Sequence, residues 1–215
     1  KINLGLDVLG KREDGYHEVR MIMQTIRMYD ILDIRKTRRP GIVLTTNLPF
    51  IPTDQRNLVY KAAQMLMEEF DVEEGLSIKL RKFIPVAAGM AGGSSDAAAA
   101  FVGVNRMFHL GLTEEQLMER AVKVGADVPY CIMRGTALAE GIGEKLTRLP
   151  EVPKCYVLIG KPGINVSTKT AYENLNLEGI GKHPDIDGLI GAIRNNDIRN
   201  PSETALLITP IRIKP

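Results

Sequence analysis

The run of small residues from Pro85 to Ala100 has the composition of a phosphate-binding loop. Three glycines and two serines come directly before strong helix formers, so the backbone can bend tightly and leave N–H groups unpaired at a helix start. The hydroxyls of Ser94 and Ser95 could bind a phosphate, or a magnesium ion that a phosphate holds. A plain loop with a good N-cap has the same composition, so both interpretations stay open.

A second candidate is a single carboxylate, Asp127, on a short turn between Gly125 and Pro129. The glycine and the proline on either side would hold this carboxylate stiffly, as a catalytic base requires. The same residue could equally be the N-cap of a turn that begins at Pro129. Asp96 opens the predicted helix and needs no role other than capping, so we keep it outside the catalytic set.

An aromatic ring and an imidazole, Tyr16 and His17, follow the polar turn from Gly10 to Gly15. Side by side at a loop tip they could stack on a planar ring and hydrogen-bond to it. An ordinary hairpin with a packed tyrosine and a solvated histidine is the alternative.

The elements that would position these residues alternate between strands and helices. Apolar positions at every second residue from Ile2 to Val8 predict a strand that places Lys1 and Asn3 on its other face. Periodicity and capping signals predict further strands and helices. The strands cover residues 31–34, 42–46, 76–80, 136–139 and 155–159; the helices cover 53–70, 95–108, 113–125 and 185–193, and Ser167-Thr168 caps one that contains Tyr172. This order predicts an α/β (α+β) fold.

Composition excludes several classes of function. The 215 residues carry a net charge of only +2, which gives no support for a nucleic-acid or membrane partner. We expect a cytoplasmic protein, because no apolar run approaches the ~18 residues that span a bilayer and no signal peptide is visible. Cys131 and Cys155 lack the spacing of a zinc or redox site.

The pattern Pro85-x-x-x-Gly89-x-x-x-x-Ser94-Ser95 resembles the phosphate loop of the GHMP kinases, a family that includes galactokinase, homoserine kinase, mevalonate kinase and phosphomevalonate kinase. The resemblance implies a two-domain α/β fold whose N-terminal domain contains a left-handed βαβ unit. It also implies ATP and Mg²⁺ as cofactors. The expected ATP-binding residues are Asn57 and Leu58 at the adenine, and Pro85, Gly89, Ala91, Gly92, Gly93, Ser94 and Ser95 at the phosphates, with Ser95 also a magnesium ligand.

The segment Gly125-Ala126-Asp127-Val128-Pro129 is similar to the segment that carries the family's proposed base, which favours the catalytic interpretation of Asp127. Lys1 would then contact both the attacking hydroxyl and Asp127, and would help the alcohol to lose its proton.

Residues 1–4, 7–17 and 135–144 resemble one member of the family, which phosphorylates the 2-hydroxyl of a cytidyl diphosphate polyol for isoprenoid biosynthesis. That resemblance implies that Tyr16 and His17 recognise the cytosine, with Tyr172 opposite the tyrosine, and that Asn3 contacts the polyol. Three alternatives remain open: another GHMP kinase acting on mevalonate, phosphomevalonate or homoserine, a non-catalytic nucleotide-binding remnant, and a purely structural domain.

We also expect the ends of the chain to differ from those of the family. A strand pattern at the first residue predicts that a short lead-in is missing, and no third glycine-rich motif follows Asn200. The predicted division is an ATP-binding and catalytic domain over residues 1–150 and a partial C-terminal domain over residues 151–215. The oligomeric state expected is monomer or homodimer.

Overall fold

A computed structural model describes residues 1–161, 172, 174–175 and 183–197 of the chain. These residues form two compact units. Unit 1 contains Lys1–Ile26, Ala87–Gly89 and the described residues from Arg134 onward, whereas unit 2 contains Arg27–Val86 and Met90–Met133. The units are interleaved along the chain, so they are a different division from the predicted domains over 1–150 and 151–215, which stay a prediction.

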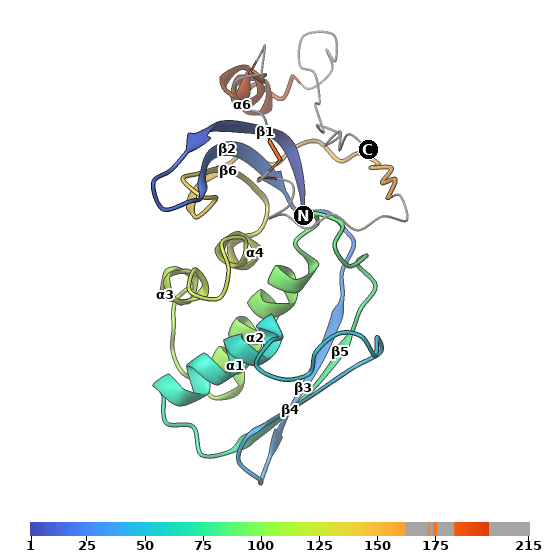
Figure 1. The fold of residues 1–215 in the computed structure, drawn as a ribbon, viewed down its shortest axis with the longest axis vertical. Helices are drawn as coiled ribbons and strands as arrows, with labels where there is room; N and C mark the ends of the chain where they lie inside the picture. The colour runs from blue at the N-terminus through green and yellow to red at the C-terminus, as the bar shows by residue number, and fades with distance from the viewer. Residues whose placement is uncertain (162–171, 173, 176–182, 198–215) are drawn as a thin grey trace. The chain divides into compact units, whose positions relative to one another are not determined.

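Unit 2 is built on a three-stranded sheet with the order β3-β5-β4 (Figure 1). Strand β3 (Ile31–Thr37) runs antiparallel to β5 (Gly75–Arg81), and β4 (Ile42–Thr46) runs parallel to β5. Helix α1 (Leu58–Glu69) connects the two parallel strands and forms a βαβ unit with them. The handedness of this unit stays the expectation that the resemblance gave.

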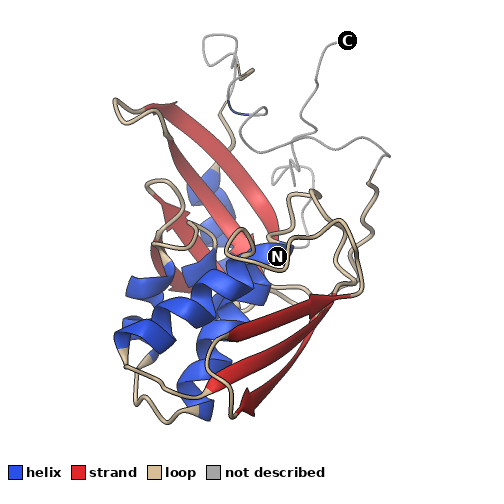
Figure 2. Ribbon diagram, turned by 60° about the horizontal axis from the view of Figure 1, so that its bottom comes forward, coloured by secondary structure: helices blue, strands red, loops and turns tan. Residues whose placement is uncertain are grey.

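Helices cover one face of this sheet (Figure 2). Helix α1 and the long helix α2 (Gly92–Met107) bury their apolar sides in one cluster with the strands, which includes Leu66, Ile78 and Phe101. Helices α3 (Glu114–Ala121) and α4 (Val128–Met133) contribute Leu117 and Val128 to the same cluster. Burial of these apolar side chains is the main force that holds α2 in place.

Unit 1 is built on a four-stranded antiparallel sheet with the order β1-β2-β6-β7. Its strands are β1 (Ile2–Lys11), β2 (His17–Gln24), β6 (Thr136–Glu140) and β7 (Lys145–Leu149). Helix α6 (Ile186–Arg194) is capped by Asp185, the first residue of the predicted helix, and packs its apolar side against this sheet. The bidentate ion pair of Arg20 with Asp187 joins the helix to β2.

Several local predictions are confirmed. Strand β4 has the predicted bounds, and Thr113 and Gln116 form the predicted capping box of α3. Other local predictions are wrong. Two bulges interrupt β1, so its alternation is not regular, and both Gly5 and Asp7 are buried. Residues 155–159 are not a strand, and Tyr156 and Leu158 are fully exposed.

Among the described residues, no helix is both long enough and apolar enough to cross a membrane.

Candidate active site

The phosphate-loop candidate leads into α2 through backbone of left-handed conformation. Ala91 is the N-cap of α2 with φ of 54° and ψ of 35°, and among the described residues no side chain caps the helix. The N–H of Ser95 is bonded to the carbonyl of Ala91, at 2.9 Å, as in a regular helix. The N–H groups of the three residues before it have no acceptor within the helix. These donors are suited to bind an anion at the positive end of the helix dipole.

Helix α2 begins at Gly92, three residues earlier than the predicted start near Ser95. The sequence placed Gly92 in the loop because glycine is a poor helix former. The structure gives a different reason for this glycine: a Cβ here would lie 3.1 Å from Cγ2 of Ile84 and 3.2 Å from Nζ of Lys82. Close packing therefore favours glycine in the first turn of α2. The bends before the helix are made at Ala87 and Gly89, which have φ of 53° and 67°.

Ser95 keeps the capacity to bind a metal ion. Its hydroxyl donates to the carbonyl of Gly92, at 2.8 Å, so its proton is used and its oxygen lone pairs remain. A hydroxyl oxygen of this kind fits Mg²⁺, which prefers oxygen ligands and is usually held through few protein groups and the substrate phosphates. Within the described part of the chain, no group of three or more acidic, histidine or cysteine side chains forms a metal site.

Asn57 has a local structural role at the expected adenine position. It is the N-cap of α1: its side-chain oxygen accepts the N–H of Val59, at 2.9 Å, and its amide donates to the carbonyl of Pro52, at 2.7 Å. The predicted caps, Thr53 and Asp54, lie before the helix. Asp54 instead binds the backbone and guanidinium of Arg56. Contact of Asn57 and Leu58 with adenine stays a prediction.

Asp127, the proposed base, is half-buried directly before α4. Its carbonyl accepts the N–H of Cys131, at 3.1 Å, and the N–H of Val128 is bonded to Gly125. The backbone on both sides of the carboxylate is therefore fixed, as the glycine and proline predicted. Lys1 belongs to unit 1 and Asp127 to unit 2, so their contact stays a prediction.

The expected substrate residues all belong to unit 1. Nζ of Lys1 donates to Oδ1 of Asn3, at 2.9 Å, as two positions on one face of a strand should. The ring of His17 stacks on that of Tyr172, with centroids 5.0 Å apart and planes inclined by 27°. Tyr16 is 59% exposed. Tyr172 thus meets the histidine of the pair, and its place opposite Tyr16 across a cytosine, which the resemblance implied, stays a prediction. The predicted cap of its helix, Ser167-Thr168, lies outside the described residues.

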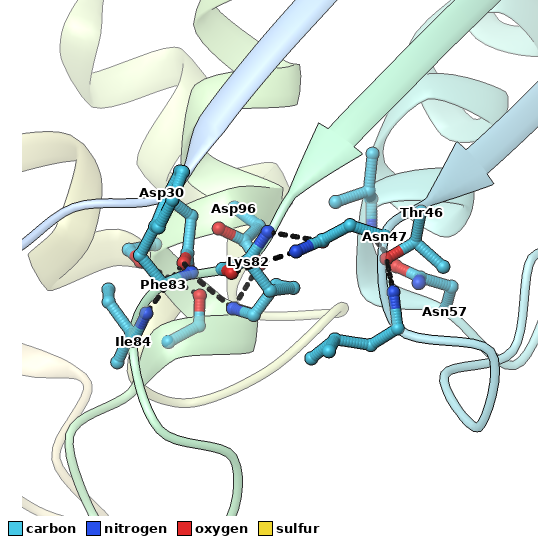
Figure 3. Close-up of polar contacts among 12 residues, drawn as sticks. Asp30, Thr46, Asn47, Asn57, Lys82, Phe83, Ile84 and Asp96 are labelled. Atoms are coloured by element: carbon cyan, nitrogen blue, oxygen red, sulfur yellow. Dashed lines mark hydrogen bonds and ion pairs between the residues drawn. The ribbon is translucent and has the colours of Figure 1, made fainter.

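Sequence reasoning missed a buried charge cluster beneath the phosphate loop (Figure 3). Lys82 Nζ contacts Asp30 and lies 2.7 Å from Oδ2 of Asp96, and the three side chains are at most 5% exposed. Asp96 therefore has an ion-pair partner, and capping does not explain it. The sequence offered one weak signal for the pair of Lys82 and Asp96, which is that they lie on either side of the loop. Asp30 lies far from both in the sequence, so no local pattern indicated it.

The two carboxylates of this cluster differ in their pKa values. Burial raises the pKa of Asp96 to about 7, against the opposing effect of the Lys82 hydrogen bond. Burial would raise the pKa of Asp30 too, but hydrogen bonds from Lys82 and from the N–H groups of Phe83 and Ile84 lower it below its ordinary value. Asp30 is therefore the ionised partner of Lys82, and Asp96 is the carboxyl that takes up a proton.

Comparison with known proteins gives one consistent result. Residues 57–135 match the family described as GHMP kinases N terminal domain. The 4-diphosphocytidyl-2-C-methyl-D-erythritol kinase of Lachnospira eligens is 56% identical over 92% of this chain and 69% of its own length, and that of Caldicellulosiruptor bescii is 52% identical over 93% and 70%.

Solved structures agree with these relatives. A crystal structure of 4-(cytidine 5'-diphospho)-2C-methyl-D-erythritol kinase superimposes with a TM-score of 0.73 and 30% identity, over 91% of this chain and 69% of that one. A homoserine kinase from Cytophaga hutchinsonii superimposes with a TM-score of 0.62 and 18% identity, over 92% of this chain and 69% of that one. This likeness shows a shared fold.

Proposed function

This chain belongs to the 4-diphosphocytidyl-2-C-methyl-D-erythritol kinase family of the GHMP kinases, and from that membership we propose the reaction and the roles of its residues. The chain is an ATP-dependent small-molecule kinase of isoprenoid biosynthesis. The reaction moves the γ-phosphoryl group of ATP to the 2-hydroxyl of 4-diphosphocytidyl-2-C-methyl-D-erythritol and releases ADP. The relatives favour this substrate over mevalonate, phosphomevalonate or homoserine, because they carry one name at more than 50% identity.

The observation that carries the proposal is the start of α2. Its left-handed N-cap and its uncapped first turn present successive N–H donors, which is the arrangement that holds a phosphate. Phosphoryl transfer depends on positioning and on neutralising charge more than on covalent chemistry. The loop from Gly89 to Ser95 would hold the triphosphate, and Asn57 and Leu58 the adenine. Ser95 would hold Mg²⁺, which offsets charge on the phosphates when it is bound.

The remaining roles fall on polar and aromatic side chains, which are half-buried except for the exposed Tyr16. Asp127 would accept the proton of the attacking hydroxyl, because its backbone is fixed at both sides. Lys1 would favour the ionised forms of that carboxylate and of the alcohol. Asn3, which is already bonded to Lys1, would contact the polyol near the hydroxyl, and Tyr16, His17 and Tyr172 would bind the cytosine.

A coupled assay of ADP release tests the reaction. The chain is given ATP, magnesium and the cytidyl substrate, and in parallel mevalonate or homoserine as acceptor. We expect turnover with the cytidyl substrate alone, and loss of that turnover by at least about 100-fold in Asp127→Asn, since general base catalysis contributes about that much. Turnover with another acceptor would contradict the substrate. ATP binding by calorimetry without turnover would favour the non-catalytic alternative.

A further inference from the structure

The charged side chain of Lys82 is buried, although burying this charge has no evident benefit for the stability of the fold. Lys82 comes directly after the end of β5, and the residue as a whole, backbone included, is 8% exposed. Its backbone N–H donates to Oδ1 of Asn47, at 2.7 Å, and its carbonyl accepts from the Asn47 amide, at 3.1 Å, which ties the end of β5 to the end of β4. Removing charges from water costs several kcal/mol per ion, and a buried ion pair is often no more stable than apolar residues of the same size. This buried cluster therefore calls for an explanation other than stability.

The location of the ammonium group gives that explanation. Asp96 lies on the second turn of α2, and a Cβ on Gly92, the first residue of α2, would be 3.2 Å from Nζ of Lys82. The ammonium group is therefore directly beneath the turn whose N–H groups form the anion site. Asp30 also accepts the N–H groups of Phe83 and Ile84, the last residues before the loop begins at Pro85. The cluster thus joins the segment that enters the loop to the helix that leaves it (Figure 3).

We propose that Lys82, held between Asp30 and Asp96, is the positioning residue of the phosphate loop, and that it orders the first turn of α2 before a nucleotide binds. Lys82 does not contact the nucleotide in this proposal. It acts through Asp96 and through the backbone of Phe83 and Ile84. The loop is short of side-chain anchors, since no side chain within the described residues caps α2, and the ion pair supplies one from below. Ordering donors in advance removes a cost that binding would otherwise include.

This inference rests on the proposed function in one respect, since it takes ATP as the ligand. The claim that the cluster orders the loop does not depend on which ligand binds. Two variants of Asp96 test it. Asp96→Ala removes the bond to Lys82, and Asp96→Asn keeps an oxygen acceptor without its charge. Both leave the contact between Lys82 and Asp30 in place. Asn105→Ala is the matched control, because Asn105 makes a similar pair of bonds to the backbone of Leu112 away from the loop.

Two quantities are measured on the 215-residue chain: the Kd of ATP with magnesium by calorimetry, and amide hydrogen exchange over residues 87–97 without nucleotide. We expect the Kd to rise about tenfold in Asp96→Ala and about threefold in Asp96→Asn, in line with the loss of a charged or a partly retained hydrogen bond. Exchange over these residues should become faster in the same order. The KM of the cytidyl substrate should not change, and Asn105→Ala should lower stability without changing the Kd.

A loss of stability in Asp96→Ala with unchanged Kd and unchanged exchange would overturn the proposal, because Asp96 would then act as Asn105 does. If Asp96→Ala does not fold, Asp96→Asn decides by the same two measurements, and no change in either would overturn it. Failure of the wild-type chain to bind ATP would contradict the proposed function. In that case hydrogen exchange of the nucleotide-free variants still tests the loop.

Discussion

At the scale of single residues, the aromatic pair of unit 1 gives a direct test of substrate recognition. Stacking of a base on an aromatic ring contributes about 1–3 kcal/mol, so Tyr172→Leu should raise the KM of the cytidyl substrate about tenfold and leave the KM of ATP unchanged. His17 and Tyr172 are already stacked, so the substrate would meet a preformed surface. Tyr29→Leu is the control, since Tyr29 is 69% exposed in unit 2. Equal effects of the two changes would contradict the assignment.

Asp96 makes stability depend on pH in a direction that can be worked out. Its pKa is about 7 in the folded chain against 3.8 ordinarily, so the folded state binds more protons than the unfolded state between these values. The free energy of unfolding contributed by Asp96 therefore falls as pH rises from about 4 to about 7. Asp30 has a lowered pKa and acts in the opposite direction, because its contribution is lost as pH falls through the folded pKa.

Urea unfolding of the wild type and of Asp96→Asn at about pH 5 and about pH 8 isolates this effect. The stability of the wild type relative to the variant should decrease between the lower and the higher pH. A difference that is constant, or that grows with pH, would show that the carboxyl of Asp96 is not the group that takes up the proton.

At the scale of elements, the left-handed residues of the phosphate loop are a source of strain. A non-glycine residue in this conformation costs about 1–2 kcal/mol, whereas glycine costs about 0.5–1 kcal/mol more entropy than alanine on folding. Ala91→Gly should therefore raise the free energy of unfolding by between 0 and about 1.5 kcal/mol. Ala99→Gly, at an exposed position in the middle of α2, should lower it by about 1 kcal/mol. Equal losses, measured by urea unfolding, would mean that Ala91 is not left-handed in solution.

The elements also show what the sequence can predict. Local signals were enough where the chain makes its own contacts: Thr113 and Gln116 cap α3 between themselves, and the apolar pattern of residues 42–46 gave β4. The start of α1 was missed because three good caps compete there. The carboxylate of Asp54 accepts a hydrogen bond from the backbone of Arg56, whereas Asn57, whose amide donates to the carbonyl of Pro52, is the cap. Residues 155–159 have strand propensity, but propensity depends on a partner strand, and none pairs with them within the described residues.

The candidate site also has parts that the sequence indicated and parts that it did not. The loop, Asp127 and the Tyr16-His17 pair were proposed as site residues from the sequence because each lies in a contiguous motif. The Lys82 cluster was not, since its members lie 52 and 14 residues apart and meet only when the sheet and α2 pack.

At the scale of the whole molecule, the proposed ligands sort by unit. Most expected nucleotide contacts, from Asn57 to Ser95, belong to unit 2, whereas Lys1, Asn3, Tyr16, His17 and Tyr172 belong to unit 1. Each unit has its own apolar core. Local opening of one unit can therefore be influenced by a ligand that leaves the other unchanged.

Amide hydrogen exchange with one ligand at a time tests this division. A non-hydrolysable ATP analogue with magnesium should slow exchange at residues 54–60 and 90–97, because bound N–H groups no longer exchange by local opening. The cytidyl substrate alone should slow exchange in β1 and at residues 15–18. Chelation of magnesium should weaken only the first effect, since Ser95 is the proposed metal ligand and carries its free lone pairs in unit 2. Protection of residues 15–18 by the ATP analogue alone, without protection of 90–97, would contradict the assignment of the nucleotide to the loop.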